Sequence, residues 1–145
     1  MRAVLINHCH PATPHVCATR MREFATALSE RGHKIILFTE TLNSSPICEP
    51  LWKTGARLQQ QSFDQPLHIA AAPVGFPLLK VLRQGRLPWG LRQLIIFWYF
   101  WRHQGVFTDW RKSSQPYLKL IADEFKPDII WSTFGGSDCW NIAKD

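Results

Sequence analysis

The residues best suited to chemistry gather just after the first apolar run of the chain. Three histidines and two cysteines lie there: His8, Cys9, His10, His15 and Cys17. Imidazole and thiolate are common zinc ligands, but structural zinc sites draw on close pairs such as CxxC, and the chain contains none. A Cys–His nucleophile pair needs a third group that orients the histidine, and the sequence identifies none. We therefore expect no metal site here and interpret these side chains as a polar loop beside a ligand cleft.

A strand, a helix and a second strand are predicted to position this loop. Residues 3–6 and 35–38 are unbroken apolar runs, as buried strands require. The helix between them is indicated by apolar residues at i, i+3, i+4 and i+7, namely Met21, Phe24, Ala25 and Leu28. Gly32 follows this helix, where a left-handed residue is favoured. Such a unit is a right-handed crossover between parallel strands that binds ligands at the carboxyl end of its first strand, so we expect the working surface at residues 8–20.

Further elements follow from the same signals. Ser114 is expected to cap a helix in which Pro116 occupies the first turn. The remaining elements are predicted as strands at residues 67–72 and 128–133 and helices at residues 91–103, 116–125 and 138–145. The predicted fold class is therefore α/β, with a Rossmann-like parallel sheet and flanking helices. Because a last helix of about two turns cannot cover its side of a parallel sheet, we expect the chain to be the N-terminal part of something larger.

Two stretches carry a family resemblance. Residues 8–39 contain a loop with prolines, an arginine in the first turn of the helix and then RGHKIILFT at residues 31–39. Residues 126–135 read KPDIIWSTFG. The two stretches resemble parts of the retaining GT-B glycosyltransferases of the family 4 type, whose patterns are rGHeVtvlT and kPDvIwat-f-g. They cover about a third of the chain and occur in the family's order.

The resemblance implies an enzyme of two Rossmann-like domains that transfers a sugar from a nucleotide-diphosphate sugar to a glycan or lipid-linked acceptor. Residues 1–145 would be its N-terminal, acceptor-side domain, with the C-terminal donor-binding domain absent, so this chain alone would be inactive. The donor is a substrate, and no cofactor is expected. The residues alone leave open a non-enzymatic Rossmann-like binding or interaction domain. The chain has neither GxxxxGKS/T nor GxGxxG after its first strand, which excludes P-loop proteins and disfavours dinucleotide-dependent dehydrogenases.

The resemblance also implies substrate-binding residues in two loops. These are His15, Cys17, Ala18, Arg20, Phe134, Gly135, Gly136 and Ser137. The family usually has glycine near Cys17, where a left-handed conformation would be strained for cysteine. Arg20 can either meet a phosphate at the helix N-terminus or pair with Glu23, and Ser137 either contacts a ligand or caps a helix. No catalytic residue is identified.

Charge and aromatic content single out one further segment. The net charge is +6, and no Asp or Glu occurs between residues 65 and 108. An anionic membrane surface is a predicted partner through Arg83, Arg86, Trp89, Arg92, Trp98, Trp101 and Arg102. The alternative is a core helix with ordinary surface arginines. Nucleic acid is disfavoured as a partner because no helix-turn-helix, zinc-finger or RNP pattern is present.

The expected location is the cytoplasm, with peripheral attachment at the inner face of the cell membrane. The N-terminus lacks the longer apolar stretch of a signal peptide, and the four cysteines show no regular spacing. The longest dense apolar run, residues 94–101, is far shorter than the roughly 20 residues that cross a bilayer.

Overall fold

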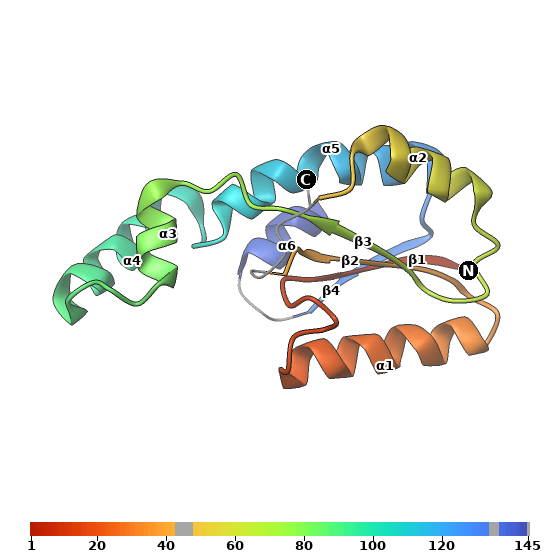
Figure 1. Cartoon of the computed structure of the whole chain (residues 1–145), viewed down its shortest axis with the longest axis horizontal. Helices are drawn as coiled ribbons and strands as arrows, with labels where there is room; N and C mark the ends of the chain where they lie inside the picture. Colours follow the sequence, from red (N-terminus) through yellow and green to blue (C-terminus); the bar gives the residue numbers. More distant parts are fainter. Residues whose placement is uncertain (43–47, 134–136, 145) are drawn as a thin grey trace.

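The computed structural model describes residues 1–42, 48–133 and 137–144 and shows helices on both sides of a sheet (Figure 1). The elements in chain order are β1 (Arg2–Asn7), α1 (Val16–Glu30), β2 (Lys34–Glu40), α2 (Leu51–Gln60), β3 (Leu67–Ala71), α3 (Pro77–Arg83), α4 (Trp89–His103), α5 (Thr108–Phe125), β4 (Ile129–Ser132) and α6 (Ser137–Lys144). The strands within these residues are hydrogen-bonded in the order β3-β2-β1-β4, and every neighbouring pair is parallel. The predicted α/β fold class with a parallel sheet and flanking helices is confirmed.

The two faces of the sheet are covered by different helices because alternate side chains of a strand point to opposite sides. In β1, Ala3 and Leu5 pack with α1, whereas Val4 and Ile6 belong to the core formed with α2, α5 and α6. The residues of β2 alternate in the same way. Both strands are therefore buried on both faces, which explains why the sequence shows unbroken apolar runs rather than an alternating pattern.

α1 confirms the helix predicted between the first two strands. Met21 and Ala25 are buried against the sheet, and Gly32 follows the helix with φ +80°. Glycine adopts that left-handed conformation at little cost. Phe24, predicted on the same face, lies at its margin, where its ring meets that of Trp131 edge to face with 4.6 Å between centroids.

α5 begins earlier than the sequence indicates. It includes both Ser114 and Pro116, so the prediction that Ser114 caps a helix beginning near Pro116 was wrong. The buried Ser114 hydroxyl instead donates a hydrogen bond to the Trp110 carbonyl oxygen at 2.7 Å, within the helix. The Trp110 side chain is fully buried and stacks on Phe38, with 6.1 Å between centroids. Burial of this large aromatic surface holds the first turns in helical form and offsets the backbone hydrogen bond lost at Pro116.

α3 and α4 form an arm, residues 77–103, that projects from the body of the molecule (Figure 1). The two helices share a small core of Leu79, Leu82 and Tyr99, which is separate from the clusters on the sheet. The helix predicted at residues 91–103 is confirmed as α4, which begins slightly earlier, at Trp89. Within the described part of the chain, none of the helices combines the length and the apolar content that crossing a membrane requires.

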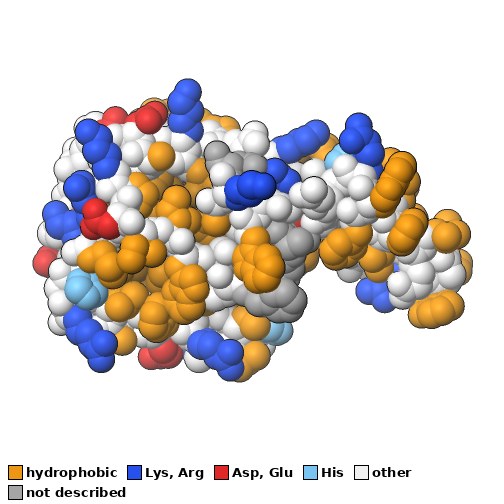
Figure 2. Space-filling view, turned by 180° about the vertical axis from the view of Figure 1, so that it is seen from behind, with side chains coloured by type: hydrophobic (Ala, Val, Ile, Leu, Met, Phe, Trp, Pro, Cys, Tyr) orange, Lys and Arg blue, Asp and Glu red, His pale blue; other side chains and the backbone are white. Residues whose placement is uncertain are grey.

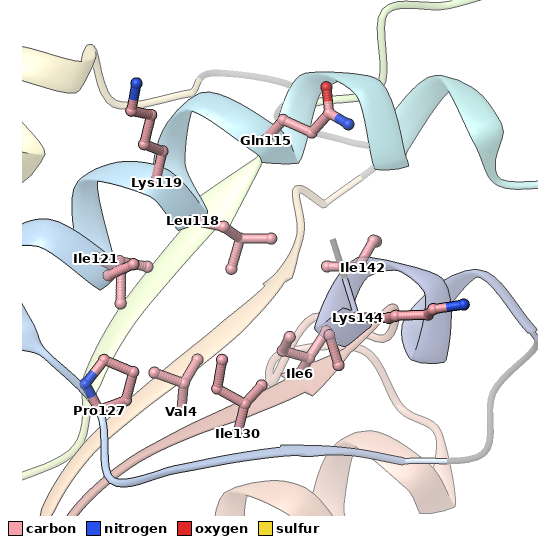
Figure 3. A pocket seen from close by; sticks show the side chains of 12 residues that line it. Val4, Ile6, Gln115, Leu118, Lys119, Ile121, Pro127, Ile130, Ile142 and Lys144 are labelled. Atoms are coloured by element: carbon pink, nitrogen blue, oxygen red, sulfur yellow. The ribbon is translucent and has the colours of Figure 1, made fainter.

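β4 forms one edge of the sheet, and its apolar side chains Ile129, Ile130 and Trp131 are exposed. A cavity of about 540 Å³ lies beside it, between the sheet, α5 and α6 (Figure 3). The apolar residues that line this cavity include Val4, Ile6, Leu118, Ile121, Ile130 and Ile142. The polar members of the lining point away from the hollow (Figure 3). Among the described residues that line the cavity beside β4, no polar groups therefore converge on a position for a ligand.

Candidate functional site

The carboxyl ends of β1 and β2 meet at one edge of the sheet, where Asn7 and Thr39 are paired in register. A cavity of about 250 Å³ lies at this edge. The described residues that line it are His8, Cys9, His10, Thr13, Glu40, Thr41, Leu42, Arg83 and Phe107. It is smaller than the cavity beside β4, but it gathers titratable and charged side chains at the edge where open parallel sheets bind ligands. This carboxyl-edge cavity is therefore the candidate functional site.

The buried side chain of Asn7 holds the loop that forms one wall of the cavity. Its Nδ2 donates a hydrogen bond to the Cys17 carbonyl oxygen at 3.2 Å, and its Oδ1 accepts one from the Cys9 N–H at 3.2 Å. His15 caps α1, since its Nδ1 accepts a hydrogen bond from the Cys17 N–H at 3.2 Å. Cys17 lies inside α1 and does not have a positive φ, so the strain considered for cysteine at this position does not arise.

The Cys9 sulfur lies close to two imidazoles. It is 3.2 Å from His8 Nε2 and 3.8 Å from His15 Nδ1. Burial raises the pKa of the Cys9 thiol, and the neighbouring Cys17 and Glu40 raise it further. Burial also lowers the pKa of His8. A protonated thiol beside a neutral imidazole is a hydrogen-bonded pair rather than an activated nucleophile, because the thiolate is the reactive form.

Another pair of histidines lies beside the cavity. The rings of His10 and His68 meet edge to face with 4.8 Å between centroids, and His68 Nε2 is 2.8 Å from Thr39 Oγ1. Burial lowers the pKa of His68 to about 4, with the charges of His10 and Arg57 acting in the same direction. His68 is therefore neutral at physiological pH and serves as a hydrogen-bonding partner of the sheet. Among the residues that the structure describes, no three His, Cys, Asp or Glu side chains are grouped so as to hold a metal ion.

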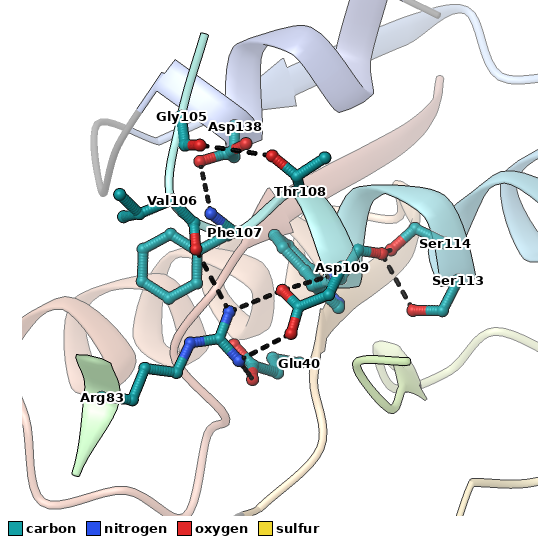
Figure 4. Close-up of polar contacts among 11 residues, drawn as sticks. Glu40, Arg83, Gly105, Val106, Phe107, Thr108, Asp109, Ser113, Ser114 and Asp138 are labelled. Carbon is teal, nitrogen blue, oxygen red and sulfur yellow. Dashed lines mark hydrogen bonds and ion pairs between the residues drawn. The ribbon is translucent and has the colours of Figure 1, made fainter. Parts of the chain in front are cut away.

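The charged part of the cavity joins Arg83 to two buried carboxylates (Figure 4). Arg83 Nη2 lies 2.7 Å from Asp109 Oδ1, and Nη1 lies 3.2 Å from Asp109 Oδ2. The contact with the other carboxylate is longer, 3.6 Å between Arg83 Nη1 and Glu40 Oε1. Asp109 is 1% exposed and Glu40 8%, whereas the Arg83 side chain keeps 29% of its surface. One guanidinium thus connects α3, α5 and the end of β2.

The carboxyl group of Glu40 titrates near neutrality. Burial raises its pKa to about 7, the positive charge of Arg83 opposes this rise, and the negative charge of Asp109 adds to it. The shorter contacts of Arg83 go to Asp109, so the guanidinium compensates Glu40 less completely. A buried carboxyl group with a pKa near 7 can accept or release a proton at physiological pH, which suits it to interact with a ligand hydroxyl.

The link between α4 and α5 completes the wall of the cavity. The Arg83 guanidinium lies over the Phe107 ring, 4.8 Å from its centroid, and the His8 ring is 5.2 Å from the same ring. The Phe107 N–H donates a hydrogen bond to Asp138 Oδ2 at 2.9 Å, in the first turn of α6. A Cβ added at Gly105 would collide with the Asp138 carboxylate, so glycine allows the link to approach α6 (Figure 4).

The structure brings together only some of the residues predicted for substrate binding. His15 and Cys17 lie at the start of α1 near Cys9. Ala18 is on the buried face of the same helix, and Arg20 is on its exposed face. The described lining of the cavity contains none of these four predicted residues. Ser137 begins α6, and the other predicted residues, Phe134, Gly135 and Gly136, lie outside the described residues. Glu23, considered as a partner of Arg20, is paired with Arg22 at 3.2 Å.

Sequence reasoning missed several residues of the site, including Glu40, Asp109 and Phe107. Glu40 and Asp109 carry a signal that could have been used. Glu40 follows the apolar run 35–38 after a single residue, at a carboxyl edge, and Asp109 is the first acid after a long acid-free segment. Arg83, predicted at a membrane surface, has its charge turned toward these two acids.

Comparison with known proteins gives no match, neither to a protein-family model nor to a curated protein nor to a solved structure.

Proposed function

We propose that this chain is the acceptor-side domain of a glycosyltransferase, which transfers a sugar from a nucleotide-diphosphate sugar to a glycan or lipid-linked acceptor. The observation that carries the proposal is the position of Glu40 in a cavity at the carboxyl edge of a parallel sheet ordered β3-β2-β1-β4. The resemblance of residues 31–39 and 126–135 to GT-B enzymes of the family 4 type supports it, since these stretches contain all of β4 and all of β2 except its last residue, Glu40.

The side chains of the cavity suit a sugar hydroxyl, which both donates and accepts hydrogen bonds. An ionised Glu40 accepts a hydrogen bond from such a hydroxyl, and a protonated Glu40 donates one. Because its pKa is about 7, both forms are populated at physiological pH. The neutral imidazole of His8, in the same lining, adds a second group that can donate or accept. In this proposal the acceptor sugar binds beside Glu40 and His8.

The donor is assigned to a second domain, as the resemblance implies. Residues 1–145 alone are then expected to turn over no nucleotide sugar. Nucleotide diphosphate release by the purified chain above a buffer blank would contradict the assignment of donor and acceptor to different domains.

The test is nucleotide diphosphate release by the full-length protein with a panel of nucleotide sugars and with glycan and lipid-linked acceptors. Glu40→Gln keeps the shape of the side chain and removes its titration. It is expected to raise the KM for the acceptor about tenfold, because a hydrogen bond to an ionised carboxylate is exchanged for a weaker one to a neutral amide. Glu30→Gln, at an exposed residue at the end of α1, is the matched control and should leave KM unchanged. Lack of reaction with every nucleotide sugar would overturn the proposal.

A non-enzymatic binding domain is the second candidate. It is favoured by the grouping of His8, Glu40 and Arg83 in the described lining of the carboxyl-edge cavity, because these side chains can hydrogen-bond a ligand without catalysing a reaction. In that case the purified chain would bind a sugar or another polyhydroxyl ligand, Glu40→Gln would weaken the binding, and the full-length protein would release no nucleotide. The chain is titrated with a sugar library and binding is monitored by NMR. Sugar binding without nucleotide release favours the binding domain, and sugar binding with nucleotide release favours the glycosyltransferase.

A further inference from the structure

The outer side of the arm carries a row of exposed apolar side chains. Tyr99 is buried in the core of the arm. Phe97 is two positions before it in the sequence, and Trp101 is two positions after it. At 3.6 residues per turn, that spacing puts them on the opposite side of α4. Leu94, Phe97 and Trp101 are 67%, 70% and 74% exposed. α4 therefore presents an apolar face to its surroundings instead of a polar one.

The apolar character extends beyond this row. Leu78, Leu94, Ile95, Phe97 and Trp98 line a shallow hollow of about 450 Å³ between α3 and α4. Trp89 is exposed at the start of α4, whereas Trp110, in the same stretch of sequence, belongs to the core of the body. Figure 2 shows hydrophobic side chains gathered on the projecting arm, with Lys and Arg side chains at its margins.

The arm is also basic. Lys80, Arg86, Arg92 and Arg102 form no ion pair among the described residues, in contrast to Arg83. At the base of the arm, a hollow of about 370 Å³ beside Trp101 gathers further positive charge. The basic groups in its lining are Arg102, His103, Arg111 and Lys112. A surface that is apolar along its length and positive at its margins has the chemistry of an interfacial helix.

We propose that the arm docks onto an anionic lipid bilayer, with Leu94, Phe97 and Trp101 at the boundary between headgroups and acyl chains. α4 has 15 residues, about 22 Å at 1.5 Å per residue, and is too short to span a bilayer, so it lies in the plane of the surface. Tryptophan favours this depth, and basic side chains at the margin meet lipid phosphates.

The charge of the arm favours lipid over a second copy of the chain. A symmetric contact between two arms would bring the same basic residues of both copies together. No acid between residues 65 and 108 is available to pair with them. An anionic bilayer supplies both the apolar phase and the opposite charge, so it satisfies both features of the surface.

Docking of the arm does not depend on glycosyl transfer, but it has a consequence for the carboxyl-edge cavity. Arg83 is the last residue of α3 and also lines that cavity. The cavity therefore lies at the base of the arm, and a docked arm holds it near the lipid surface. Within the proposed function, this position fits an acceptor whose sugar is attached to a lipid.

The test is co-sedimentation of the chain with vesicles of phosphatidylcholine alone and of phosphatidylcholine with phosphatidylglycerol. Binding is expected to the anionic vesicles only and to weaken in high salt. Trp101→Ser should reduce binding severalfold. Trp52→Ser is the matched control, because Trp52 is 76% exposed on α2, away from the arm. Circular dichroism of both variants checks that they fold.

A second pair of variants tests the charges. Arg92→Gln with Arg102→Gln is expected to weaken binding about thirtyfold, or about fivefold for each charge removed. Arg20→Gln on α1 with Arg31→Gln at its C-cap removes the same charge from the body and should have little effect. Equal binding to both kinds of vesicle, or no loss of binding with Trp101→Ser, would overturn the proposal. If the parent protein does not bind vesicles but forms dimers, and Trp101→Ser abolishes these dimers, the arm would instead be a contact surface for a second copy of the chain.

Discussion

Arg83 and Asp109 form a bidentate ion pair that connects the arm to the body, with Nη2–Oδ1 and Nη1–Oδ2 distances of 2.7 and 3.2 Å. Asp109 is almost fully buried, and its Oδ1 also accepts a hydrogen bond from the Trp110 N–H at 3.0 Å. A buried ion pair is costly to break because the remaining charge is left in the interior without an opposite charge to compensate it. The pair therefore matters for the position of the arm, for the titration of Glu40 and for the stability of the fold.

Arg83→Gln is expected to destabilise the protein by about 3 kcal/mol. This value is at the low end of the range for breaking a buried pair, because the Arg83 side chain is partly exposed. Urea unfolding followed by far-ultraviolet circular dichroism measures the change. Arg86→Gln, on the same arm, is the control and should stay within about 0.5 kcal/mol of the parent protein. Equal midpoints for the two variants would show that the Asp109 carboxylate does not need its partner.

The Glu40 carboxyl makes stability depend on pH. Its pKa is raised from the model-compound value of 4.5 to about 7 in the folded protein, so the folded state binds more protons than the unfolded state between these values. Stability relative to Glu40→Gln should therefore fall as pH rises from about 4.5 to above 7, by up to roughly 3 kcal/mol. The difference between the two proteins is the quantity to measure, since the low pKa of His68 produces an opposite trend in both. A difference that does not change with pH would contradict the raised pKa.

Gly105→Ala is expected to destabilise the fold by about 1–3 kcal/mol, since the new methyl group meets the Asp138 carboxylate. Gly90→Ala, in the first turn of α4, meets no neighbouring atom and should be neutral or slightly stabilising. Thermal unfolding compares the two variants. Combining Gly105→Ala with Asp138→Ala should recover part of the loss if the collision is its cause. Loss of the same size in both glycine variants would point to backbone flexibility instead.

The exposed edge strand β4 is expected to make the chain self-associate at high concentration. Unpaired strand edges with apolar side chains are templates for association between molecules. Ile129→Lys should raise the concentration at which light scattering increases, because a charge at the edge opposes pairing. Val16→Lys adds the same charge at an exposed apolar residue of α1 and should not. A monodisperse monomer at high concentration in the parent protein would refute the prediction.

The sheet could be predicted from the sequence because its central strands are buried on both faces. Residues 3–6 and 35–38 are unbroken apolar runs, the helix between them shows apolar residues at helical spacing, and Gly32 marks its end. The start of α5 was misplaced because Ser114 and Pro116 form a convincing local helix start. The position of the helix is decided instead by Trp110, whose burial depends on residues distant in the sequence.

The site could be predicted only in its location. The carboxyl end of β1 follows from the topology, and His8, Cys9 and His10 do line the cavity there. The charged residues come from β2, α3 and α5, and no spacing in the sequence brings them together. In the sequence, Arg83 cannot be distinguished from the other arginines of the basic segment. Its position beside two acids depends on how the arm folds against the body.

The separate core of the arm has a thermodynamic consequence. Leu79, Leu82 and Tyr99 bury one another without support from the clusters on the sheet, so the arm can lose its structure while the sheet keeps its own. Such a unit opens with a free energy smaller than that of global unfolding. Backbone amides of α3 and α4 would then exchange their hydrogens sooner than those of β1 and β2, and the ion pair at Arg83 sets how far the two rates differ.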